Sequence, residues 1–317
     1  MTLTVRHYRN TDAAEICTVW NSHHELLGPF LPLTPMHLEI FVLAKQYFDA
    51  QNLLLVENES RVEGFIQLAQ TSIDGLEDQA TKISASSICI RPSEDEEQVA
   101  AKLIEAACER AQALGASSCD FKPPLPHASF FVGLGIGDSM VGLTTLEGRT
   151  EQWLRAAGFE PITPVSQWEL DLGNFQPPVD RQLIQIRRSA QVSRQIDEPN
   201  LAWWQACLLG HTEPTAFHLL HRTEGRLLAD VLFWTLATEL VTTPESVAWL
   251  WPPQLPEQDE EKAQLLFLLC EAIRELQSER VDTVRCVSAA QDDELIELLR
   301  KVGFRSSLSG FQLSKSL

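Results

Sequence analysis

The chain has 317 residues, of which 44% are hydrophobic and 22% charged, so it is long enough for about two domains with substantial cores. Its formal net charge is −19 and its isoelectric point lies near 4.8, which excludes nucleic acid and anionic membranes as expected partners. The N-terminus lacks the apolar core of a signal peptide, and no apolar run approaches the roughly 20 residues of a membrane helix, so we expect a cytoplasmic protein.

The first half alternates strand and helix patterns. It opens with a strand-like run, LTVRHYR, and continues with a helical region that contains His23 and His24. The stretch 52–70 alternates apolar and polar runs around a short polar turn, as a β-hairpin does. The remaining expected elements are a strand at 83–90, a long helix that opens with an acidic box at 93–103, a helix that ends in Gly-Phe at 153–161, and a strand at 168–172.

The second half repeats this order. A strand is expected at 183–188 and a hairpin at 217–236. The stretch EQDEEKAQLL corresponds to the acidic box of the first half. LLRKVGFRS (298–306) again ends a helix in Gly-Phe and precedes a strand, FQL. Gly158 and Gly303 are both placed for a left-handed helix cap. Four matches in the same order predict a duplicated domain, with one copy at 1–175 and the other at 176–317.

The two copies differ in length at one place. Glu97 and Gly158 are 61 positions apart, whereas Glu261 and Gly303 are 42 apart. The extra residues fall in a Pro- and Gly-rich stretch, which we expect to be an insertion at about 122–146 in the first copy only.

The order of hairpin, strand, long helix and terminal helix-Gly-Phe-strand resembles the GNAT acetyltransferase superfamily, present here twice in tandem. The resemblance implies an α/β (α+β) fold in which each domain is a mixed, mostly antiparallel sheet flanked by helices. It also implies that acetyl-CoA binds where the sheet splays after its fourth strand, and that an acetyl group passes to an amine.

The family's phosphate-binding motif, Gln/Arg-x-x-Gly-x-Gly/Ala, is degenerate in both copies. In the first copy only Ala100 of the matching stretch 95–100 conforms, and in the second Gln258 and Ala263 conform. Ser93 and Glu96 have the spacing of a capping box, and Pro256 can open the second long helix. The resemblance places the cofactor on the fourth-strand edge, on the start of the long helix, and beside one cation of the second copy. These residues are Ile88, Cys89, Ile90, Gln98, Val99, Ala100, Ala101 and Lys262.

Catalytic groups are poorly matched. The tyrosine that many family members place four residues before the Gly-Phe glycine is replaced by Leu154 and Leu299. Glu245 and Asp230 are the candidates for a general base, although an edge or loop carboxylate is the simpler interpretation of each. Adjacent histidines point to different faces of a helix, and the seven cysteines form no CxxC pair, so no metal is expected.

The sequence therefore favours an acyl-CoA-dependent N-acetyltransferase that acts on a small amine. The alternative is a catalytically retired GNAT-fold module that binds a ligand or a protein. The expected cofactor is acetyl-CoA without a metal, and a homodimer is possible.

Overall fold

A computed structural model describes residues 2–27, 32–71, 82–125, 127–134, 140–195, 203–236 and 245–317. The described chain divides into two compact units, each built from discontinuous segments. Unit 1 comprises Met1–Val165, Ala202–Gly210 and Ser309–Leu317, and unit 2 comprises Ser166–Leu201 and His211–Leu308. The domain boundary expected at 175/176 stays a prediction.

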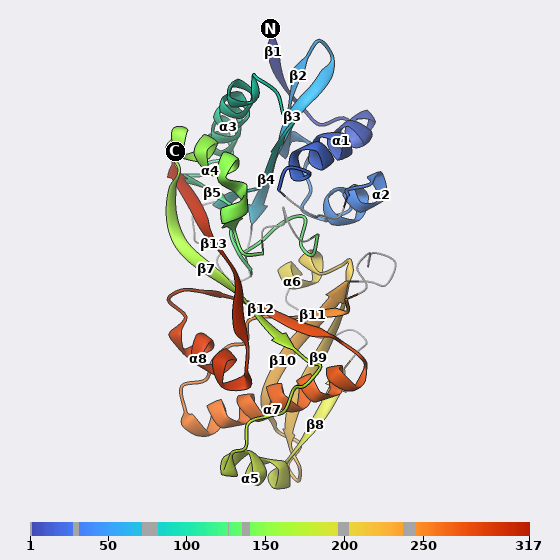
Figure 1. Cartoon of the computed structure of the whole chain (residues 1–317), viewed down its shortest axis with the longest axis vertical. Helices are drawn as coiled ribbons and strands as arrows, with labels where there is room; N and C mark the ends of the chain where they lie inside the picture. Colours follow the sequence, from blue (N-terminus) through green and yellow to red (C-terminus); the bar gives the residue numbers. More distant parts are fainter. Residues whose placement is uncertain are drawn as a thin grey trace. The chain divides into compact units, whose positions relative to one another are not determined.

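Unit 1 is a sheet with helices on both faces (Figure 1). Its strand order is β1-β2-β3-β4-β5-β13, and β6 pairs with β13. Pairing is antiparallel except between β4 and β5. The strands are β1 (Leu3–His7), β2 (Leu53–Asn58), β3 (Arg61–Thr71), β4 (Lys82–Ile90), β5 (Ser118–Phe121), β6 (Leu143–Thr144) and parts of β7 (Glu160–Asp171) and β13 (Arg305–Ser316).

Helices α1 and α2 lie on one side of this sheet, and α3 and α4 lie on the other (Figure 1). The helices are α1 (Ala13–His24), α2 (Pro35–Leu38), α3 (Glu96–Ala113), α4 (Gly148–Ala156) and α6 (Trp203–Leu208), with short turns at Asn10–Asp12, Glu39–Leu43, Ala50–Asn52 and Thr145–Glu147. The apolar side of α3, which includes Leu103, Ala107 and Ala111, packs on the β2–β4 face. Helix α1 packs on the other face, against β3 and β4.

Unit 2 repeats the same strand order as β8-β9-β10-β11-β12-β7. Strands β8 to β11 pair antiparallel, and the fourth and fifth strands, β11 and β12, are again a parallel pair. The elements are α5 (Arg181–Ser189), β8 (Ala190–Gln195), β9 (Thr212–His221), β10 (Leu227–Leu236), β11 (Val247–Leu250), α7 (Asp259–Ser278), β12 (Thr283–Ala289) and α8 (Asp293–Val302). The repeated order establishes that the two units share one topology.

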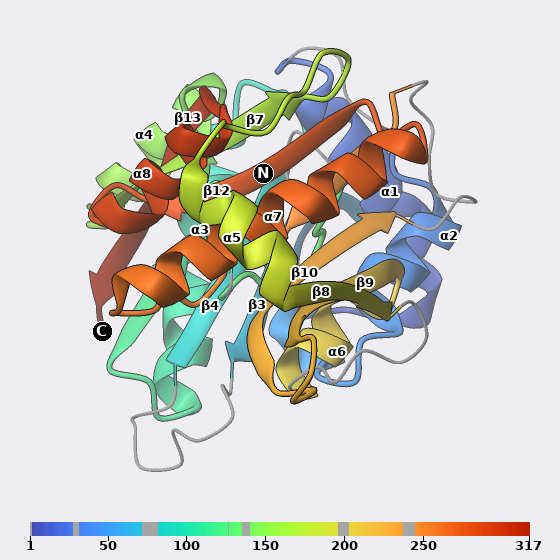
Figure 2. The same cartoon turned by 90° about the horizontal axis from the view of Figure 1, so that it is seen from below.

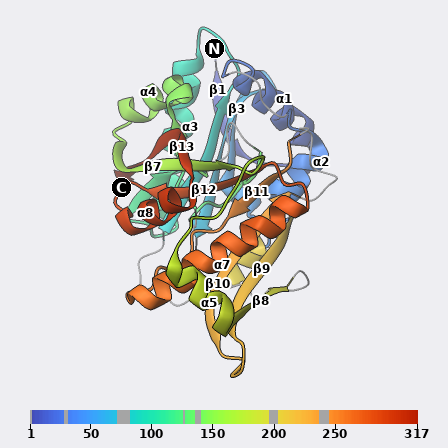
Figure 3. The ribbon, with the colours of Figure 1, turned by 60° about the horizontal axis from the view of Figure 1, so that its bottom comes forward.

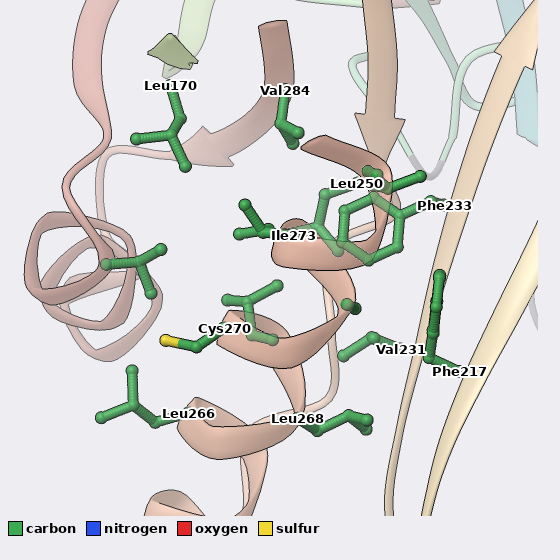
Figure 4. Packing of buried hydrophobic residues seen from close by; sticks show 14 of the residues in the cluster. Leu170, Phe217, Val231, Phe233, Leu250, Leu266, Leu268, Cys270, Ile273 and Val284 are labelled. Atoms are coloured by element: carbon green, nitrogen blue, oxygen red, sulfur yellow. The ribbon is translucent and has the colours of Figure 1, made fainter. Parts of the chain in front are cut away.

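The core of unit 2 lies between α7 and the sheet. Helix α7 crosses the strands diagonally, with α5 beside it (Figures 2 and 3). Figure 4 shows side chains of α7 directed toward β9, β10 and β11. The labelled core residues are Leu170, Phe217, Val231, Phe233, Leu250, Leu266, Leu268, Cys270, Ile273 and Val284. The consecutive residues 265–270 of α7 are all buried, so this part of the helix is covered on every side, by the sheet and by α5 and α8.

Several expected elements are confirmed. Both hairpins are present as β2–β3 and β9–β10, and Gly158 and Gly303 take left-handed conformations with φ of 88° and 114°. Between β5 and α4 the chain runs through 122–147, whereas between β12 and α8 it needs only 290–292. The segment 122–147 is called the excursion below, and 126 and 135–139 within it lie outside the described residues.

The strand expected at 183–188 is wrong, because these residues form α5. Asp180 accepts a hydrogen bond from the Gln182 N–H at 2.8 Å and caps the helix. Leu183 is buried while Ile184 is 53% exposed, so burial follows helical spacing. The first strand of unit 2 is β8, immediately after this helix.

Candidate functional site

The pairing between the fourth and fifth strands of unit 1 ends midway along β4, because β5 ends at Phe121. They pair at Ile83, Ser84 and Ala85 only, whereas β4 pairs with β3 along its length. The Arg91 N–H donates to Glu63 O at 2.8 Å. Because polar groups alternate between the two edges of a strand, those of Ile90 and Ile88 point away from β3. This is the edge on which the sequence places a cofactor.

His23, from the end of α1, lies at this edge. Its Nδ1 is 3.3 Å from Ile90 O and 3.4 Å from Ile90 N. Burial lowers the pKa of His23 to about 3, assisted by the positive potential of His24 and Arg149, so the ring is neutral at physiological pH. A ligand that pairs with Ile90 must displace the His23 ring.

A buried ion pair joins the two ends of the excursion. Lys122 Nζ donates to Glu147 Oε1 at 2.5 Å, and the two side chains are 2% and 4% exposed. Glu147 Oε2 also accepts bonds from Thr144 N at 3.0 Å and from Thr144 Oγ1 at 3.1 Å. Because the carboxylate is fully hydrogen-bonded, the pair can persist away from water.

The middle of the excursion packs beside β4. The Ser129 hydroxyl bonds to the Ser86 hydroxyl, and the Tyr47 hydroxyl donates to Ser129 O. Phe131 stacks on Trp20 of α1 with 4.5 Å between ring centroids. The described part of the excursion therefore packs against β4 and α1.

The start of α3 is acidic but lacks the expected cap. Asp95 is the N-cap residue and makes no side-chain capping bond, so the predicted Ser93–Glu96 capping box is wrong. The Glu96 carboxylate instead accepts a bond from Arg149 of α4 at 2.8 Å. The N–H groups of Gln98 and Val99 bond to Asp95 O. Arg149 draws the carboxylate away from its own helix end because a guanidinium is the stronger donor.

A groove of about 710 Å³ separates α3 from α4. Ala100, Ala101 and Ala157 line it with small side chains, and Trp153 and Lys315 also contribute. Three glutamates on α3 face the same groove: Glu97, Glu105 and Glu109. Its shape suits an extended ligand, while its charge opposes an anionic one.

Unit 2 has a corresponding groove of about 440 Å³ between α7 and α8. Lys262, the cofactor-side cation expected from the sequence, lies there and bonds to Glu294 at 2.9 Å. The expected helix start at Pro256 is wrong, because α7 begins at Asp259 after the N-cap residue Gln258. Each unit therefore has a groove between its long helix and its terminal helix.

Comparison with solved structures identifies this architecture. A glucosamine N-acetyltransferase region, GCN5-related, of a fungal multi-domain GH3 β-N-acetylglucosaminidase aligns with 99% of this chain and 38% of that one, at 13% identity and a TM-score of 0.72. A tandem GNAT protein from the clavulanic acid biosynthesis pathway aligns over 99% and 98%, at 14% identity and a TM-score of 0.63. The chain has a tandem GNAT fold. At sequence level, no family model and no curated protein matches it.

A bacterial example extends the likeness. The GCN5-related N-acetyltransferase from Sphaerobacter thermophilus aligns over 99% of this chain and 95% of that one, at 11% identity and a TM-score of 0.59. None of the described helices is long and apolar enough to cross a membrane.

The two carboxylates expected as bases both lie in the second GNAT unit. Glu245 accepts bonds from Thr283 at 2.7 Å and from Arg285 at 3.5 Å. Asp230 lies on β10, exposed, and opposite His218 in the strand register. The catalytic role of these two carboxylates stays a prediction.

The sequence did not predict the buried polar cluster in front of β4 of the first GNAT unit, formed by His23, His24, Cys89, Lys122 and Glu147. The one available signal was position: Lys122 directly follows a strand, and Glu147 directly precedes a helix. Cys89 and Ile88 lie on β4 as expected, with opposite orientations, since Ile88 packs in the α3 core and Cys89 meets α1 residues.

Proposed function

We propose that the protein transfers an acyl group from acyl-CoA, with acetyl-CoA as the simplest donor, to a small amine. The observation that carries the proposal is the end of the β4–β5 pairing after Ala85, in a unit that also has a groove between α3 and α4, within a tandem GNAT fold. An extended pantetheine arm needs such an unpaired strand edge for its amide groups.

The cofactor is assigned to unit 1. The edge at Ile88, Cys89 and Ile90 would pair with the pantetheine arm, and the first turns of α3, from Gln98 through Val99 and Ala100 to Ala101, would face the pyrophosphate. Glu97 opposes the phosphate charge, so we expect weak binding. Lys262 would take the corresponding role in unit 2.

The charge of the protein supports an amine acceptor. A net charge of −19 attracts cations, and protonated amines are the commonest small organic cations. Because the pKa of His23 is about 3, its ring is too weak a base to deprotonate an ammonium group. The proposal for unit 1 therefore rests on proximity and orientation, and Glu245 and Asp230 remain the proposed bases for unit 2.

One observation supports the alternative function, a catalytically retired GNAT-fold module. His23 occupies the Ile90 edge, which a working cofactor site would leave for pantetheine. In that reading the fold binds a ligand or a protein without chemistry.

A calorimetric titration of the full chain with acetyl-CoA separates these functions. The variant Ala101→Trp fills the unit 1 groove, and Ala263→Trp fills the unit 2 groove as its matched control. We expect Ala101→Trp to weaken binding by about tenfold or more, a loss of ~1.4 kcal/mol, while Ala263→Trp leaves it unchanged. The opposite pattern would move the cofactor to unit 2. Absence of binding by the unmodified chain at millimolar acetyl-CoA would favour the catalytically retired module over the acyltransferase.

A further inference from the structure

An arginine of α4, Arg149, holds the acidic start of α3. Its Nη1 donates to Glu96 Oε2 at 2.8 Å, and Glu96 is the first residue of α3. Its Nη2 is buried and has no hydrogen-bond partner among the described residues. The two side chains as a whole are 30% and 22% exposed, so the ion pair lies at the edge of the solvent. We propose that Arg149 binds a phosphate group of acyl-CoA in exchange for Glu96, a role that rests on the proposed function.

The Glu96 carboxylate satisfies only part of the guanidinium group. A guanidinium presents parallel N–H groups that match two oxygens of one carboxylate or phosphate. Glu96 bonds to Nη1 alone, and Nη2 is left as a buried donor without an acceptor, which is rare in folded proteins. A phosphate group has enough acceptor oxygens to bond to both nitrogens of Arg149 at once. Exchange of Glu96 for a phosphate would therefore satisfy the donor that the carboxylate leaves unpaired.

The start of α3 has no cation of its own for a phosphate. Residues 92–101 contain four acidic residues and no lysine or arginine. Arg91, directly before them, is bonded to Val62 O at 2.8 Å and to the Glu15 carboxylate at 2.7 Å. A pyrophosphate at the first turns of α3 therefore needs positive charge from another element, and α4 supplies it through Arg149.

Arg149 also lies close to the surfaces that the proposed function assigns to the cofactor. Its guanidinium carbon lies 5.5 Å from the centre of the Trp153 ring, which restricts its position, and Trp153 lines the α3–α4 groove. The Trp153 ring centroid is in turn 6.1 Å from that of His23, the side chain at the Ile90 edge. A ligand that displaces His23 from Ile90 and enters the groove therefore comes within reach of Arg149.

The alternative role of Arg149 is a structural tether between α3 and α4, and two substitutions separate the two roles. If Arg149 is only a tether, Arg149→Gln and Glu96→Gln break the same bond and change ligand binding in the same direction. If Arg149 binds phosphate, the effects are opposite. Arg149→Gln then removes the group that binds the ligand, whereas Glu96→Gln removes its internal competitor and one opposing charge.

The test is calorimetric titration of the full chain with coenzyme A and, separately, with inorganic pyrophosphate. We expect Arg149→Gln to weaken the binding of both by about tenfold or more, since it removes hydrogen bonds to a charged group. Glu96→Gln should tighten both several-fold, roughly by the strength of a partly exposed ion pair. The matched controls are Arg155→Gln and Glu151→Gln, which break a second ion pair of α4, of 2.7 Å, and should bind like the unmodified chain.

The outcomes separate this role from the proposed function. Changes of the same sign in Arg149→Gln and Glu96→Gln would overturn the role of Arg149 and leave the cofactor site to other residues. Pyrophosphate binding with the expected opposite signs, without binding of coenzyme A, would support Arg149 and reject the acyl-CoA function. Absence of binding of either ligand, at millimolar concentration, to the unmodified chain and to Glu96→Gln would overturn both. If Arg149→Gln does not fold, Arg149→Lys replaces it, because it keeps the charge, loses the two-nitrogen contact and should still weaken binding.

Discussion

At the scale of single residues, buried polar groups decide most of what is unusual in this protein. Lys45 is 7% exposed, and its ammonium group donates to Cys207 O at 3.2 Å and to Leu208 O at 2.7 Å. These carbonyls end α6, where a cation complements the helix dipole. Burial nevertheless lowers the pKa of Lys45 to about 8, partly opposed by the Cys207 side chain.

This pKa shift predicts a pH-dependent stability. Between pH 8 and the unfolded value near 10.4, folded Lys45 loses its proton while the unfolded chain keeps it, so the free energy of unfolding rises with pH. The penalty of burying the ammonium group is fully present below pH 8. We expect the unfolding free energy of the unmodified chain, minus that of Lys45→Met, to rise by up to about 1.4 kcal/mol per pH unit in this window.

Urea denaturation of both proteins at several pH values measures this difference. Subtraction of the variant removes the cysteine thiols, whose pKa values are raised by burial and which titrate in an overlapping range. A difference that stays flat from pH 8 to 10 would show that Lys45 keeps an ordinary pKa.

At the scale of elements, the sequence predicts whether a segment is a helix or a strand better than it predicts the residue at which the element begins. The hairpins and long helices were correct because each carries a strong period over many residues. Residues 183–188 failed because a short apolar run suits either element, and the deciding signal was the single cap at Asp180. The capping box predicted at the start of α3 is absent because Arg149, 53 positions away, binds Glu96. The His23–His24–Cys89 cluster was unpredictable for the same reason, since no local pattern joins α1 to β4.

The docking of β6 on β13 gives an element-scale prediction. A Cβ atom on Gly310 would lie 2.4 Å from Val141 O and 2.8 Å from Leu143 O, both backbone atoms. Gly310→Ala should therefore force these strands apart and destabilise the protein by about 1–3 kcal/mol or more. Gly148→Ala is the control, because a Cβ there meets nothing within 4 Å and φ is −56°.

Thermal unfolding of the two variants tests this contact. The control should be unchanged or slightly stabilised, by about 0.4–1 kcal/mol, because alanine restricts the unfolded chain. Equal melting temperatures for the two variants would mean that β6 is not held against β13 as described.

At the scale of the whole molecule, each of the two compact units is built from segments that are not continuous in the sequence. Unit 1 takes its last strand from Ser309–Leu317, so that β13 residues 313–316 pair with β5. Leu313 is fully buried in the unit 1 core. The duplication could be predicted from sequence because it repeats motifs. The pairing of β13 with β5 of unit 1 could not be predicted from sequence, since either repeat could supply a strand of the same pattern.

Deletion of 309–317 should therefore destabilise unit 1, although it removes nothing from unit 2. Hydrogen exchange should rise at Ser118–Phe121 and stay unchanged in α7, since β5 loses its antiparallel partner. Leu313→Ala is the milder variant, with an expected loss of about 2–5 kcal/mol. Faster exchange in α7 than in β5 would contradict the assignment of this strand to unit 1.

The same strand constrains the order of events during protein synthesis. Residues 309–317 are translated after all of unit 2, and 143 residues, 166–308, separate them from Val165. At about 5–20 residues per second, this delay is roughly 7–30 s. N-terminal domains usually fold first during translation, but here the β5 edge waits unpaired throughout the interval. The nascent chain therefore exposes the unpaired edge of β5 to chaperones until β13 has been synthesised.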